Sequence, residues 1–92
     1  MKQFQLQICT PAGTFFDGEA GQLSVRGVSG SLSILAGHTP FATVIQPPEC
    51  RVYLSDGSVR EGVCGDGFLT TDGALTRLFL STFSWKDEAP RT

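Results

Sequence analysis

Apolar and polar side chains alternate one by one along several short stretches of this chain. In the first stretch Phe4, Leu6 and Ile8 alternate with glutamines, the pattern of a strand with one buried and one solvent-facing side. The same period of two recurs at Leu23–Val25, Leu32–Ile34 and Val52–Leu54. The alternation therefore predicts β-strands from one end of the chain to the other.

Glycine and proline divide the chain between these stretches. The eleven glycines and five prolines leave no segment for a helix of ordinary length, and Pro40 interrupts residues 36–45, the one stretch where a helix is conceivable. The pairs Asp56-Gly57 and Asp72-Gly73 predict hairpins, because glycine tolerates the positive φ that such turns require. Further turns are expected at Pro11–Gly13, Asp17-Gly18, Gly27–Gly30, Gly37, Pro47-Pro48 and Gly65–Gly67. This spacing indicates an all-β fold, a flattened β-sandwich or barrel of about nine or ten short strands in two sheets.

The length of 92 residues is that of a single domain. We expect residues 1–82 to form the sandwich. After Thr82 the sequence becomes polar and contains Pro90, so residues 83–92 are expected to be a polar C-terminal tail, partly disordered.

Charge and cysteine content narrow the function classes. The net charge is −2 and the seven Lys and Arg residues are scattered, which excludes the basic surface that nucleic-acid binding needs. No apolar run approaches the roughly 20 residues of a spanning helix, and no signal peptide is recognisable, so we expect a soluble protein kept on the cytoplasmic side. Cys9, Cys50 and Cys64 are odd in number and lack C-x-x-C spacing, which predicts free, mostly buried thiols.

The residue types that carry chemistry form no recognisable catalytic or metal motif. His38 is the only histidine, and its place between Gly37 and Thr39 predicts a hydrogen bond to the backbone of a turn. A dyad or zinc site of His38 with cysteines stays open as an alternative, without support from spacing. The glycines from Gly27 to Gly37 lack the Lys-Ser or Lys-Thr of a phosphate-binding loop, and the acidic residues are dispersed. We therefore expect no catalytic residue, no cofactor and no metal.

Aromatic residues are numerous for so small a sandwich. In the strand expected at residues 74–80, apolar side chains from Leu78 to Leu80 fall on both faces, so one face must meet something other than the core. Phe83 and Trp85 lie beyond this strand. Two interpretations stay open for them: a docking patch for a partner, or an aromatic cluster packed on the end of the sandwich.

The segment Gly27–Pro40, GVSGSLSILAGHTP, resembles the G-x-x-G-x-(L/F)-x-I-L-x-G-H-x-P signature of the epsilon subunit of F-type ATP synthases, called delta in mitochondria. Other segments are similar to that family's motifs in the same order: Phe4–Pro11 to its opening strand, Phe16–Glu19 to its (Y/F)-D-G-E turn, Phe41–Pro47 to its L-L-T-A-L-K-P strand, and Gly67–Leu69 to its G-G-F-L turn. One departure is Pro47-Pro48, where the family usually has Pro-Gly.

The resemblance implies a non-catalytic rotor subunit of the central stalk, which links the gamma subunit to the membrane c-ring and supports ATP synthesis coupled to proton transport. It implies no nucleic-acid partner and a place on the cytoplasmic face of the bacterial plasma membrane, with membrane association only through the complex. By position in the family's motifs, Thr10, His38 and Thr43 are expected near gamma, and Ser29, Gly30 and Ser31 at the c-ring.

Members of the family usually continue as a two-helix hairpin that restrains ATP hydrolysis and sometimes binds ATP. The sequence ends before such a hairpin, so neither activity is expected of this chain. The alternative function is a free-standing β-sandwich interaction module unrelated to the synthase.

Overall fold

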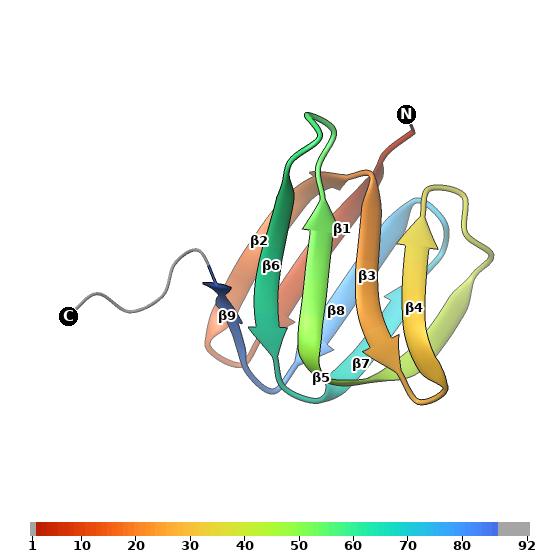
Figure 1. Cartoon of the computed structure of the whole chain (residues 1–92). Helices are drawn as coiled ribbons and strands as arrows, with labels where there is room; N and C mark the ends of the chain where they lie inside the picture. The colour runs from red at the N-terminus through yellow and green to blue at the C-terminus, as the bar shows by residue number, and fades with distance from the viewer. Residues whose placement is uncertain (1, 87–92) are drawn as a thin grey trace.

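The computed structural model describes residues 2–86, which form strands and turns (Figure 1). Nine strands are present in these residues, which confirms the all-β prediction. They are β1 (Phe4–Thr10), β2 (Gly13–Ala20), β3 (Gln22–Gly27), β4 (Gly30–Leu35), β5 (Phe41–Tyr53), β6 (Val59–Cys64), β7 (Gly67–Thr71), β8 (Leu75–Leu80) and β9 (Phe83–Trp85).

The strands lie in two layers (Figure 1). The back layer contains β2, β1, β8, β7 and the first half of β5, in that order. The front layer contains β4, β3, the second half of β5, β6 and β9. β1 and β8 pair in parallel, and the other ladders are antiparallel, so the sheet is mixed. The sandwich does not close into a barrel, because β2, β4 and β9 each pair with a strand on one side only.

β5 crosses from the back layer to the front layer. Its partners in β3 are Gln46 opposite Arg26 and then Cys50 opposite Val25, so residues 47–49 of β5 have no partner in β3. Proline has no amide hydrogen for a ladder, and Pro47-Pro48 therefore fits a segment that leaves one sheet before it enters the next. The expected turn at these prolines is corrected: they lie inside a strand of 13 residues.

A second expected turn, Asp17-Gly18, also lies inside a strand. β2 runs through both residues, and the Gln5 side-chain amide donates a hydrogen bond of 2.6 Å to the Asp17 carboxylate across the β1–β2 ladder. The hairpin predictions are confirmed, since Gly57 and Gly73 occupy the β5–β6 and β7–β8 turns with φ of 89° and 97°. Gly37 also has a positive φ, at 80°.

The core lies between the two layers. The back layer contributes the alternate side chains of β1, β7 and β8, and the front layer those of β3, β5 and β6. The most deeply buried side chains are Leu6, Ile8, Leu23, Ile34, Ile45, Leu69, Leu78, Val52, Thr76 and Cys50. The period-two pattern thus placed the buried face of these strands correctly.

The boundary expected after Thr82 falls within the fold. Phe83–Trp85 forms β9, which pairs with β6 through Cys64–Phe83 and Gly62–Trp85. Both aromatic rings are buried, so these residues belong to the sandwich and not to a polar tail. A strand of three residues shows too little alternation to be found from sequence. The rest of the expected tail, residues 87–92, lies outside the described residues.

Candidate interaction surface

A row of apolar side chains crosses the outer surface of the back layer. Cys9 is opposite Phe79 on β8, Phe79 is opposite Phe68 on β7, and Phe68 is opposite Val44 on β5. Each of these residues has a neighbour in its strand that points inward, since Ile8, Leu78, Leu69 and Ile45 are fully buried. The four side chains of this outer row therefore face away from the core.

Phe68 and Val44 are the most exposed members of the outer row. Half of Phe68 and 54% of Val44 are accessible to solvent. The Phe68 and Phe79 rings contact each other with centroids 5.1 Å apart, which orders them without removing them from water. A row of this kind spanning four strands is typical of a docking surface. The sequence pattern predicted a second apolar face on β8, but Phe68 and Val44 were missed. The signal that could have found them is the same one, because Phe68-Leu69 and Val44-Ile45 are consecutive apolar residues.

The outer row borders an apolar hollow of about 380 Å³. Its lining residues come from the end of β1 and the adjoining parts of β7 and β8: Cys9, Thr10, Pro11, Gly67, Phe68, Phe79 and Leu80. Thr10, expected near gamma, thus lies at this hollow, where its hydroxyl accepts a 3.0 Å hydrogen bond from the Ala12 amide. The hollow is suited to an apolar side chain of a partner.

Thr43 and the Ser29–Ser31 segment lie together at a different hollow. This second hollow, of about 210 Å³, is lined by the β3–β4 turn, Leu32, Phe41 and Thr43. Ser29 is in the turn, whereas Gly30 and Ser31 begin β4, and Gly30 has a φ of 121° that favours glycine. One residue expected near gamma is therefore next to the three expected at the c-ring.

His38 is separated from Thr10 along the sandwich. It lies in the β4–β5 loop, where the neighbouring Gly37 amide donates to the Gly73 carbonyl of the β7–β8 turn. Thr10 lines a hollow with Gly67 and Leu80, at the opposite ends of β7 and β8. His38 Nδ1 is 2.8 Å from the Thr39 carbonyl oxygen, which confirms the predicted backbone bond. Thr10, His38 and Thr43 are thus spread along the molecule and do not form one cluster.

The docking interpretation of Phe83 and Trp85 is corrected. Only 7% of Phe83 and 4% of Trp85 are exposed, and their rings pack edge to face with centroids 4.8 Å apart. Phe15 and Phe16 of β2 contact the same pair. The alternative is what the structure shows: an aromatic cluster that fills the gap between the β2 and β9 edges.

The three cysteines are free thiols, as predicted. Cys50 and Cys64 are buried in the front layer, and Cys9 is half-buried. Burial, together with the neighbouring Cys64, raises the pKa of Cys50 to about 12, and burial also raises the pKa of Cys64. Both thiols stay protonated at neutral pH and act as small apolar core groups.

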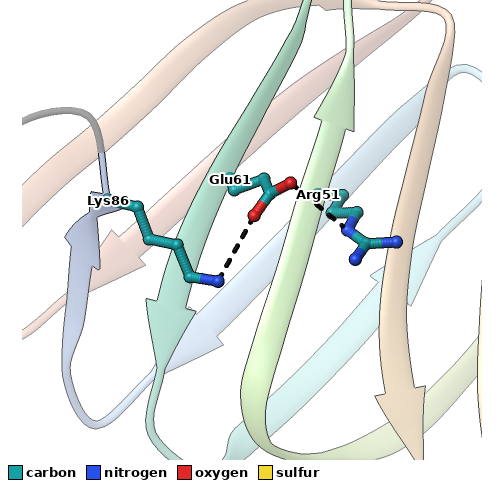
Figure 2. Close-up of polar contacts among 3 residues, drawn as sticks. All are labelled: Arg51, Glu61 and Lys86. Carbon is teal, nitrogen blue, oxygen red and sulfur yellow. Dashed lines mark hydrogen bonds and ion pairs between the residues drawn. The ribbon is translucent and has the colours of Figure 1, made fainter.

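The outer surface of the front layer carries a cluster of ion pairs. Arg51 and Lys86 flank Glu61, with nitrogen–oxygen distances of 3.8 and 3.3 Å (Figure 2). All three side chains are about half exposed, so these ion pairs add little to stability. Each outer surface also carries residues of the other kind: Asp17, Glu19 and Arg77 on the back layer, and Val59 and Val63 on the front layer. What distinguishes the back layer is the continuous apolar row across four strands.

Residues 2–86 hold no group of three or more His, Cys, Asp or Glu side chains arranged to bind a metal ion. Within the same residues there is also no helix of the length and apolar character required to cross a membrane.

The fold is that of an open β-sandwich domain with a mixed sheet. The sequence profile of the family "ATP synthase, Delta/Epsilon chain, beta-sandwich domain" matches residues 3–85. The chain belongs to this family.

Curated relatives agree with the assignment. The chain is 36% identical over 89 residues to the ATP synthase epsilon chain of Ruminococcus albus, which covers 96% of this chain and 66% of that protein. It is 39% identical over 82 residues to the epsilon chain of Chromohalobacter salexigens, covering 89% and 58% of the two chains. It is also 31% identical over 85 residues to the "ATP synthase epsilon chain, sodium ion specific" of Acetobacterium woodii, covering 92% and 64%. The chain thus spans about two thirds or less of the length of these relatives.

Solved structures show the same fold. A chain of the Euglena gracilis mitochondrial ATP synthase, in a structure of OSCP, F1 and c-ring, matches with a TM-score of 0.87 at 17% identity, over 96% of this chain and 56% of that one. A chain from the central stalk and c-ring of the Tetrahymena thermophila mitochondrial enzyme matches with a TM-score of 0.74 at 14% identity, over 95% and 69%.

Proposed function

We propose that this chain is a non-catalytic rotor subunit of an F-type ATP synthase. In this role it links the gamma subunit of the central stalk to the membrane c-ring and supports ATP synthesis coupled to proton transport. Membership of the Delta/Epsilon family over residues 3–85 and the central-stalk setting of a structural relative support the proposal.

The observation that carries the proposal is the apolar outer row of the back layer. The outer row of the back layer consists of the apolar side chains of Cys9, Phe79, Phe68 and Val44. Their burial against a partner would be favourable, because it removes apolar surface from water. The front layer presents Arg51, Glu61 and Lys86, which remain hydrated. A stalk subunit needs one surface for a permanent partner, and we assign the back layer to gamma.

Two of the residues expected near gamma fit this assignment. Thr10 lines the hollow that borders the outer row, and Thr43 directly precedes Val44 on β5. Thr43 points to the other side of that strand, so any contact it makes is at the rim of the surface. His38 lies at the far end and contacts gamma only if that subunit extends along the whole sandwich.

The β3–β4 turn is assigned to the c-ring. Ser29, Gly30 and Ser31 lie with the exposed Val28 at an uncharged turn at one end of the sandwich (Figure 1). Such a turn is suited to rest on the loops of a ring without the cost of desolvating a charge. The chain then lies on the cytoplasmic face of the bacterial plasma membrane and is held there only by the complex.

Co-purification with a recombinant bacterial gamma subunit tests the proposal. We expect a stable one-to-one complex and no ATP hydrolysis by the chain alone. The absence of a complex, under conditions where a longer epsilon chain binds the same gamma subunit, would favour the free-standing interaction module instead.

A further inference from the structure

The sandwich is closed along one side and open along the other. On the closed side the gap between β2 and β9 is filled by Phe15, Phe16, Phe83 and Trp85. On the open side β4 pairs only with β3. The first half of β5 pairs with β7, and only its residues 45 and 46 also reach β3. The hollow beside Leu32 and Phe41 lies between these two free edges.

Among the strands of residues 2–86 that pair on one side only, β2 and β9 carry features that discourage pairing with another chain. β2 has the exposed charges Asp17 and Glu19 and a register shift against β1 that leaves Phe15 as an extra residue. β9 is three residues long and is followed by Lys86. Charges, bulges and short length are the features that usually protect sheet edges from pairing with another chain.

β4 has none of these protections. Its six residues pair with β3 in unbroken register, and no Asp, Glu, Lys or Arg occurs from residue 27 to residue 48. Val28, in the turn before the strand, and Leu35, at its end, are 62% and 51% exposed. An edge of this length and composition in a soluble protein is expected to be covered by another strand.

The hairpin geometry defines which groups of β4 are available. Because Val28 and Ser29 form a two-residue turn, Gly27 and Gly30 are a hydrogen-bonded pair, and pairs alternate from there. Ser31, Ser33 and Leu35 therefore lie in non-hydrogen-bonded pairs. Their amide and carbonyl groups point to the free edge. The Leu35 carbonyl already accepts a 3.2 Å hydrogen bond from the His38 amide. The edge therefore offers an added strand three donors, the amides of Ser31, Ser33 and Leu35, and two acceptors, the carbonyls of Ser31 and Ser33.

We propose that β4 accepts an extended segment of the gamma subunit as an additional strand. This inference rests on the proposed function. Gamma is the occupant because the open side is continuous with the outer row: Phe41 and Thr43 of the hollow and Val44 of the row belong to the same half-strand. The segment that fits is uncharged, with an apolar side chain for the hollow between Leu32 and Phe41.

Amide hydrogen exchange tests the proposal without any variant. In the complex with gamma, the Ser31, Ser33 and Leu35 amides should exchange at least about tenfold more slowly than in the free chain, as newly bonded amides do. The Leu32 and Ile34 amides, already bonded to β3, serve as internal controls. Unchanged exchange at all three outward amides in a demonstrated complex would overturn the inference.

A pair of substitutions provides the second test. Ser33→Pro removes the outward amide and leaves the β3 ladder intact, whereas Ser33→Ala removes the same side chain and keeps the amide. We expect Ser33→Pro to bind gamma roughly tenfold or more weakly than Ser33→Ala, with both variants folded as judged by circular dichroism. Equal affinities would contradict strand addition.

The outcomes separate this inference from the proposed function. If the wild-type chain does not bind gamma, the proposed function fails. If it binds but Ser33→Pro binds equally well, only the strand addition fails. If the free chain forms a dimer that Ser33→Pro disrupts, the edge is occupied by a second copy and the choice of gamma is wrong.

Discussion

The indole nitrogen of Trp85 donates a 3.3 Å hydrogen bond to the main-chain carbonyl oxygen of Phe15. This bond joins β9, the last strand, to the bulge of β2 near the start of the chain. The two strands share no ladder, so the closed side of the sandwich is held by this bond and by the aromatic contacts around it.

Truncation of Trp85 should therefore destabilise the whole domain. We expect Trp85→Ala to lower the free energy of unfolding by about 3–5 kcal/mol, because it removes a buried ring and leaves a cavity. Trp85→Phe keeps most of the packing and loses the indole donor, so its cost should be about 1–2 kcal/mol. Urea denaturation measures both. A loss below about 1 kcal/mol for Trp85→Ala would show that β9 contributes little to the fold.

The fluorescence of Trp85, the only tryptophan, reports its environment directly. Since only 4% of the side chain is exposed, emission in the free chain should already be blue-shifted and acrylamide quenching weak. Addition of gamma should change neither property. A strong blue shift on binding would restore Trp85 as a docking residue.

Gly67 should not accept a side chain. A Cβ atom at this position would overlap the Phe79 carbonyl oxygen, which belongs to the backbone of the neighbouring strand. We expect Gly67→Ala to destabilise by about 1–3 kcal/mol or more, as over-packing does. Gly18 is the matched control, since it also lies in a strand but a Cβ there would meet only the Phe16 ring at 3.7 Å. Equal melting temperatures for the two alanine variants would contradict the close approach of β7 to β8.

The stability of the domain should fall at alkaline pH through its buried thiols. The folded-state pKa of Cys50 is about 12, above the ordinary value of 9.0, so above pH 9.0 the unfolded chain loses a proton that the folded chain retains. The free energy of unfolding should therefore decrease as pH rises from 9.0 towards 12, by up to about 1.4 kcal/mol per pH unit for Cys50. Cys64, whose pKa is also raised, acts in the same direction.

Urea denaturation at about pH 8 and about pH 10.5 measures this effect. Cys50→Ala is the control: it costs some packing at both pH values but should show a shallower decrease between them. The same decrease in wild type and Cys50→Ala would mean that other groups cause the alkaline loss.

Much of the fold could be predicted from the sequence because the strands are amphipathic. Phe4, Leu6 and Ile8 reach the core as their alternation requires, and the Asp-Gly pairs at residues 56 and 72 form the expected hairpins. The predictions failed where turn-forming residues lie inside strands. Asp17-Gly18 is bridged across the ladder by the Gln5 side chain, and Pro47-Pro48 lies in the part of β5 that has no partner in β3.

The interaction surface was harder to predict for a different reason. Phe68 and Val44 become neighbours only through the order of β5, β7 and β8, which alternation does not define. Phe83 and Trp85 looked exposed because nothing in their own sequence indicates that β2 and β6 enclose them. Cross-strand neighbours decide both cases, and a single sequence does not contain that information.

The most direct test of the central claim compares two substitutions of the same residue type on opposite layers. Val44 belongs to the outer row and is 54% exposed, whereas Val59 lies on β6 in the front layer and is 45% exposed. Calorimetric titration of gamma with Val44→Asp should show a loss of affinity of about tenfold or more, since a carboxylate would be desolvated at the interface. Val59→Asp should bind as the wild type does. Wild-type affinity for Val44→Asp, or a loss confined to Val59→Asp, would contradict the assignment of the back layer to gamma.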